Sequence, residues 1–97
     1  MECSLAPDAE QELVESGLYY AREANAELAH AFISEFECSV ALISERPELG
    51  APWRGEVRRF PLRRFPYSIV YYLSKGRIRI LAVAHQSRKP GFWRGRK

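Results

Sequence analysis

Side chains able to transfer a proton near neutral pH are scarce in the C-terminal half of this 97-residue chain. General acid–base chemistry on a phosphate ester would need a base, an acid for the leaving oxygen and cations for the developing negative charge. Glu56 is the one acid after residue 53, so His85 is the best acid–base candidate, with Arg64 and Arg88 as accompanying cations. The alternative is a structural histidine that forms hydrogen bonds at the end of a strand.

Positive charge is concentrated in the same half of the chain. Residues 1–53 contain two basic residues and eleven acids, a net charge of −9, whereas residues 54–97 contain thirteen basic residues and one acid, a net charge of +12. Such asymmetry favours a surface that meets an anionic partner, either nucleic acid or an acidic protein segment. The alternative is a sheet edge that arginines protect against aggregation. The candidate binding residues of this part are Arg58, Arg59, Arg63, Arg64 and Arg79.

Nothing in the sequence indicates a metal or an organic cofactor. The two cysteines, Cys3 and Cys38, have no partner at ligand spacing, which argues against a zinc site. Apolar runs are far shorter than the roughly 18 residues of a membrane span, and the N-terminus lacks a secretory signal pattern. We therefore expect a cytoplasmic protein without membrane contact.

The elements that must position these side chains begin with a short strand and two helices. We predict a strand over residues 2–6 and a helix over 7–23, with Pro7 at its first position, where a missing N–H is tolerated. Asn25 is a competent N-cap for a second helix that ends at Arg46, before a proline. An apolar stripe with helical spacing predicts that one face of this helix is buried. The stripe consists of Leu28, Phe32, Phe36, Val40 and Ile43.

Beyond a turn-rich loop at 47–56, the apolar period changes from 3.6 to 2, which indicates strands. Lys75 and Gly76 should form the centre of a hairpin turn. The expected fold class is α+β, in the order β-α-α-β-β-β, with an antiparallel sheet and both helices packed on one face. The predicted later strands cover residues 56–62, 67–73 and 77–85.

The string RRFP occurs twice, at residues 58–61 and 63–66. A spacing of five would place the two phenylalanines on opposite faces of one strand, and proline cannot donate to a central ladder. We therefore expect the first copy to end one strand and the second to lead into the next. Strict alternation also predicts four residues on one face of the last strand. These are Ile78, Ile80, Ala82 and Ala84.

The C-terminal tail, residues 88–97, is basic and aromatic and has no period. We expect it to be loosely held or ordered by a partner, with Phe92 and Trp93 as large interface anchors. Neither ring can exchange protons. The alternative is that both rings fold onto the core. The flanking cations are Arg88, Lys89, Arg94 and Arg96.

Two strings, VRRFPLRRFPYSIVYYL and IRILAVAHQSRKPGFW, resemble the RelE/ParE superfamily of bacterial toxins, nearer to its ParE branch. The string LAPDAEQELVESGLYYAREANAELAHAF is similar to the paired helices at the start of these toxins. The resemblance covers nearly the whole chain and implies a single toxin domain over residues 1–97. Its most specific positions are RFPY at 64–67, then Ala84, His85, Arg88, Pro90 and Trp93.

This resemblance implies the toxin of a type II toxin–antitoxin pair, held inactive by a cognate antitoxin. ParE-like members act on DNA gyrase, and RelE-like members cut messenger RNA on the ribosome. RelE-like nucleases use sheet lysines and arginines and often a tyrosine or histidine near the C-terminus, yet no tyrosine follows Tyr72 here. We therefore favour a gyrase inhibitor that acts by binding.

Two alternatives stay open at this point. One is a ribosome-dependent mRNA endonuclease that uses His85, and the other is an inert plasmid stabilization relative or a simple basic binding module. In each toxin case the partners would be the antitoxin and either gyrase or the ribosome with its mRNA. A homodimer and a toxin–antitoxin hetero-oligomer are both compatible with the sequence.

Overall fold

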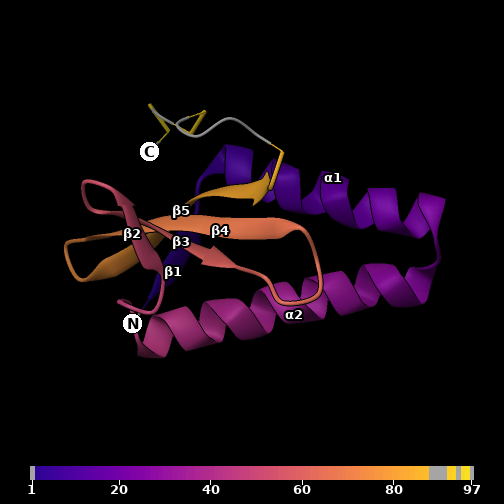
Figure 1. The fold of residues 1–97 in the computed structure, drawn as a ribbon, viewed down its shortest axis with the longest axis horizontal. Coiled ribbons are helices and arrows are strands. Elements are labelled where there is room, and N and C mark those ends of the chain that lie inside the picture. The colour runs from indigo at the N-terminus through magenta and orange to yellow at the C-terminus, as the bar shows by residue number, and fades with distance from the viewer. Residues whose placement is uncertain (1, 88–91, 94, 97) are drawn as a thin grey trace.

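A strand, two helices and four further strands make up the part of the chain that the computed structural model describes, residues 2–87, 92, 93, 95 and 96 (Figure 1). The predicted α+β class and the order of its elements are confirmed, with one strand more than expected. The elements are β1 (Cys3–Leu5), α1 (Pro7–Glu23), α2 (Ala26–Glu45), β2 (Ala51–Arg54), β3 (Val57–Pro61), β4 (Tyr67–Ser74) and β5 (Arg77–His85).

The two helices begin where the sequence predicts. Pro7 occupies the first turn of α1, and acidic residues follow it near the positive end of the helix dipole. Asn25 caps α2, because its Oδ1 accepts a hydrogen bond from the Leu28 N–H at 2.7 Å. The helix ends at Glu45, one residue before the predicted end. No helix in the described residues is long and apolar enough to cross a membrane.

The sheet has the strand order β1-β5-β4-β3-β2. Neighbouring strands are antiparallel except for β1, which pairs in parallel with β5, so the sheet is mixed and not wholly antiparallel. The extra strand, β2, lies within the segment predicted as a loop. Pro52 is one of the residues that made this segment resemble a turn. Proline lacks an N–H, but β2 lies at the edge of the sheet, where a missing N–H is tolerated.

A bulge in β5 changes which side chains share a face. Tyr71 pairs with Ile80 while Val70 pairs with Ala82, which leaves Leu81 as an extra residue. The prediction that Ala82 and Ala84 share a face with Ile78 and Ile80 is therefore wrong. Beyond the bulge, the two alanines pack with Val70 on the opposite face, and Val83 takes the helix-covered side.

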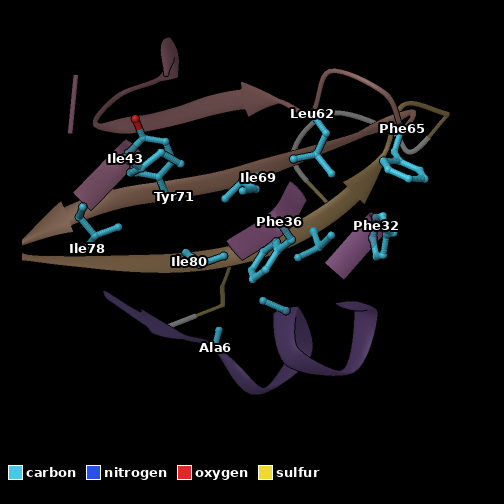
Figure 2. Close-up of a cluster of buried hydrophobic side chains, with 12 residues drawn as sticks. Ala6, Phe32, Phe36, Ile43, Leu62, Phe65, Ile69, Tyr71, Ile78 and Ile80 are labelled. Atoms are coloured by element: carbon cyan, nitrogen blue, oxygen red, sulfur yellow. The ribbon is translucent and has the colours of Figure 1, made fainter. Parts of the chain in front are cut away.

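The main core lies between the helices and the sheet. Figure 2 shows Phe32, Phe36 and Ile43 of α2 beside Ile69 and Tyr71 of β4. Phe32, Phe36 and Ile43 of the predicted stripe are buried and Val40 is partly buried, whereas Leu28 at the start of the helix is over a third exposed, so the prediction fails at that residue. Ile69 and Tyr71 are fully buried. The other sheet face, which no helix covers, is called the open face below. Its apolar cluster consists of Val70, Leu81, Ala82, Ala84 and Trp93.

Candidate functional site

The first RRFP copy sends its two arginines to opposite faces of the sheet. Arg58 lies opposite Tyr71 on the helix-covered face, and its Nη1 donates to the carbonyls of Gly50 at 2.7 Å and Glu48 at 3.1 Å. Arg59 lies opposite Val70 on the open face, with its guanidinium 5.1 Å from the centre of the Trp53 ring. The two side chains therefore belong to different surfaces.

The second RRFP copy lies in the connection between β3 and β4. This confirms the prediction that the first copy ends one strand and the second leads into the next. Backbone N–H groups of Arg63 and Arg64 donate to the Glu35 carboxylate of α2. The Arg64 Nε also contacts Glu35 Oε1 at 3.2 Å, although two thirds of the Arg64 side chain is exposed. Burial alone would raise the pKa of Glu35, but these donors and the Arg64 charge together lower it.

His85 is exposed at the end of β5 and is hydrogen-bonded locally. Its Nδ1 lies 2.8 Å from the Ser87 Oγ and accepts from the Ser87 N–H at 3.1 Å. The bulge places it opposite Tyr67, and the two rings meet edge to face at 5.1 Å. No hydrogen bond or ion pair joins His85 to Arg64 in the described part of the chain. Arg88, the third candidate nuclease residue, lies outside the described residues.

Of the tail residues that the structure describes, Trp93 is packed against the domain, so for this ring the alternative of folding onto the core is the correct one. Trp93 is only 5% exposed, lies on the open-face cluster and meets the Trp53 ring at 5.8 Å. Phe92 is half-buried at the edge of the same cluster. Of the two predicted anchors, Phe92 alone retains substantial exposed surface. Arg94 and Lys89 lie outside the described residues.

Arg96 ties the tail to the start of α1. Its guanidinium makes two hydrogen bonds to the Glu12 carboxylate, at 2.9 and 3.1 Å, and an ion pair with Asp8 at 3.4 Å. It also donates to the Leu81 carbonyl at 3.0 Å, while Glu12 accepts the Val83 N–H at 3.1 Å. Glu12 and Arg96 thus satisfy backbone groups at the bulge of β5.

The Glu12–Arg96 link was missed from sequence. The acids of the first turns of α1 were explained by the helix dipole, and no sequence spacing connects residue 12 with residue 96. No sequence signal marks the link, because the backbone groups that it satisfies are left free by the bulge of β5, which is visible only in the strand pairing.

The predicted basic surface is therefore divided among several places. Arg59 and Arg79 lie on the open face, Arg58 reaches the loop after α2, and Arg63 and Arg64 lie over α2. Arg79 donates from Nη1 to the Ser4 Oγ and the Leu5 carbonyl, both at 3.1 Å. In the described residues no cluster of three or more His, Cys, Asp or Glu could hold a metal ion. The arrangement offers cations and aromatic rings for binding.

Comparisons with known proteins place this fold. Residues 4–90 match the family model described as ParE toxin of type II toxin–antitoxin system, parDE. A solved structure titled chromosomal ParDE TA system from P. aeruginosa superimposes with a TM-score of 0.77 at 20% sequence identity. The match covers 88% of this chain and 95% of that chain, and it shows a shared fold. No curated protein matches the chain.

Proposed function

The chain belongs to the ParE toxin family of type II toxin–antitoxin systems, and from this premise we propose that it inhibits DNA gyrase by binding, in the cytoplasm, until a cognate antitoxin neutralises it. The observation that carries the proposal is the family match over residues 4–90, which is nearly the whole chain. Gyrase is the target that the resemblance to ParE-like toxins implies.

The state of the acid–base candidates supports binding over RNA cleavage. His85 is engaged with Ser87, and Arg64 is engaged with Glu35. An arginine is a poor proton donor at neutral pH, so a nuclease built here would depend on His85 for both proton transfers. A ribosome-dependent endonuclease is therefore the outcome against which gyrase inhibition is tested.

We place the gyrase contact at the tail, with Phe92 as the aromatic anchor and Arg88 and Arg94 as flanking cations. Buried Trp93 would support this contact from beneath, because its ring fills the open-face cluster. Phe92 also lies 5.0 Å from the Arg96 guanidinium, which in turn is fixed to Glu12. Phe92 would thus be held by a contact that already exists in the free protein, which lowers the entropy lost on binding.

The antitoxin is expected to carry an extended acidic segment that orders on the basic half of the toxin. Charge complementarity would guide it to the exposed arginines, with Arg59 and Arg64 as the leading candidates. Antitoxin and gyrase would compete if the antitoxin also covers the tail.

The test titrates the purified full chain into a gyrase supercoiling assay and, in parallel, maps cleavage of ribosome-bound message. We expect inhibition without cleavage, and we expect His85→Ala to inhibit as wild type does. Phe92→Ala should weaken inhibition about tenfold or more, as loss of an aromatic interface anchor does. Tyr19→Ala, at a half-exposed aromatic residue on α1, is the matched control. Message cleavage that disappears in His85→Ala would overturn the proposal.

A further inference from the structure

The open face carries a cavity of about 530 Å³ at the β4–β5 hairpin. Its lining comes from two cross-strand rows. Arg79 lies between Ser4 of β1 and Tyr72 of β4, and Arg77 lies opposite Ser74 one row further along. Residues paired across a ladder share a face, so their side chains converge. The lining residues are Ser4, Tyr72, Ser74, Lys75, Arg77 and Arg79.

The charge of this cavity has one sign. Lys75, Arg77 and Arg79 contribute three cations, and no acid is among the described residues that line it. Arg79 is held in place, because its Nη1 donates to the Ser4 Oγ and to the Leu5 carbonyl. A fixed guanidinium loses little freedom when an anion binds beside it, so this site is partly preorganised.

The hairpin turn places a lysine where the backbone disfavours it. Lys75 has a φ of 53° and Gly76 a φ of 75°, as a type I′ turn requires. Asparagine, aspartate or glycine is the usual first residue of such a turn, since a residue with a long side chain is strained at positive φ. A strained residue at the rim of a cavity points to a use for its side chain, here an ammonium group in a lining that also contains two arginines.

We propose that this cavity binds the phosphate group of a nucleotide, either free or within a nucleic-acid chain. Guanidinium groups match phosphate oxygens with paired donors, the lysine adds a point charge, and the serine hydroxyls supply further donors. The volume exceeds what a phosphate alone would fill and lies in the range of small-molecule sites. Tyr72 supplies an aromatic ring in the lining, against which a base can stack.

This site lies away from Phe92, the proposed gyrase anchor, although Tyr72 also packs at the edge of the Trp93 cluster. Arg77 and His85 mark the two ends of β5, eight residues apart, which is roughly 26 Å in an extended strand. The tail packs on Leu81, Ala82 and Ala84, in the half of the strand toward His85. Loss of phosphate binding would therefore leave the gyrase proposal untouched, and the reverse also holds.

The experiment measures fluorescence anisotropy of a fluorescein-labelled thymidine decamer as the full chain is added, at several salt concentrations. Lys75→Asn removes the charge while suiting the positive φ, so its melting temperature should not fall. Arg77→Gln removes a second exposed cation. We expect the double variant to bind the decamer at least about tenfold more weakly than wild type. The slope of the logarithm of the binding constant against the logarithm of salt concentration should be smaller by about 1.4. Arg54→Gln, an exposed arginine of β2, controls for net charge.

Competition then identifies the source of the phosphate. Displacement of the decamer by thymidine triphosphate supports a site for free nucleotides, and a decamer displaced only by unlabelled decamer supports a nucleic-acid chain. The proposal is overturned if Arg54→Gln weakens binding of the decamer as much as Arg77→Gln does. It is also overturned if the wild-type chain binds neither the decamer nor thymidine triphosphate. Decaglutamate competing as well as unlabelled decamer would overturn it too, because the surface would then select negative charge and not phosphate.

Discussion

The two faces of the sheet are built from the same strands but are closed by different means. On the helix-covered face, large side chains of β4 and β5 meet a continuous apolar stripe of α2. On the open face, two of the three apolar residues of β5 are alanines, and two tryptophans, Trp53 and Trp93, pack at their cluster. One face is closed by a helix hairpin and the other by single side chains from an edge strand and the tail.

The comparison shows that the two faces contribute differently to the stability of this toxin. The helix-covered face can supply most of the buried apolar area, because whole helices lie against it. The open face keeps room for cations, with Arg59 near Trp53 and Arg79 beside β1. Substitutions on the two faces should therefore differ in size and in kind.

The largest effect is expected from Phe32→Ala. Phe32 is fully buried, and its ring lies within 5.3 Å of the ring centres of Tyr20, Phe65 and Tyr67. The cavity left behind should lower the free energy of unfolding by about 4 kcal/mol, measured by chemical denaturation. Leu28→Ala, on the same helix but over a third exposed, should cost less than about 1 kcal/mol. Equal losses at the two positions would contradict this account of the helix-covered core.

Trp93→Ala should produce a smaller loss, about 3 kcal/mol, because the cluster that Trp93 completes is smaller than the helix-covered core. The variant should also expose the small side chains of β5, which a dye that binds apolar surface would report. Trp93→Phe is the matched variant, since it keeps much of the ring and removes an Nε1–H that has no acceptor among the described residues. It should be clearly more stable than Trp93→Ala. If Trp93→Ala lowers the free energy of unfolding more than Phe32→Ala does, the open face contributes more to stability than the helix-covered face, which contradicts this account.

Tyr71→Phe tests a polar link on the helix-covered side. The Tyr71 hydroxyl donates to the Pro47 carbonyl at 2.6 Å and accepts the Gly50 N–H at 2.8 Å. Without it the Gly50 N–H is buried and unpaired, which should cost about 2 kcal/mol in unfolding free energy. Gly50 must stay a glycine here, because a Cβ would lie 2.6 Å from that hydroxyl.

The control for this change is Tyr72→Phe on the open face. The Tyr72 hydroxyl makes no hydrogen bond within the described residues, so its removal should leave the denaturation midpoint nearly unchanged. A midpoint that shifts as much for Tyr72→Phe as for Tyr71→Phe would show that the loop link contributes nothing specific.

The smallest effect is expected for the change of stability with pH at Glu35. Burial would raise the pKa of Glu35, yet the N–H groups of Arg63 and Arg64 and the Arg64 guanidinium bring it below the ordinary value. A lowered pKa in the folded state stabilises the protein above the ordinary carboxyl pKa of about 4.5, and this contribution is lost as pH falls through the folded value. The stability gap between wild type and Glu35→Gln should therefore narrow from pH 6 to pH 3.

Glu37→Gln, an exposed position of the same helix, is the control for this series. Its stability relative to wild type should change little over the same pH range. If the difference in unfolding free energy between wild type and Glu35→Gln stays constant down to pH 3, the charged form of Glu35 is not stabilised by the second RRFP copy.

Most of the fold could be predicted because its signals are local. Proline at the start of α1, asparagine before α2 and the change of period after residue 56 each act through neighbours in the chain. The extra strand β2 was missed because an edge strand tolerates Pro52 and needs no apolar alternation. The bulge at Leu81 was missed because an inserted residue is visible only when the partner strand is known.

The candidate site was harder to predict than the fold. The second RRFP copy, the buried Trp93 and the Glu12–Arg96 link all depend on contacts between distant parts of the sequence. Charge counting located the basic half correctly, but it could not show that Arg58 and Arg59 face opposite ways until the strand and its register were fixed. Cavity-lining residues such as Arg77 gave no motif at all, since only the pairing of three strands brings them together.

The pairing of β1 with β5 has a consequence for synthesis. Cys3 lies beside Ile78, and Arg96 binds Glu12, so these two contacts cannot form until residues 78 and 96 have been synthesised. At ribosomal speeds of 5–20 residues per second, that takes roughly 5 to 20 s. A nascent fragment that stops before residue 78 therefore has neither β1 nor β5 in its place in the sheet.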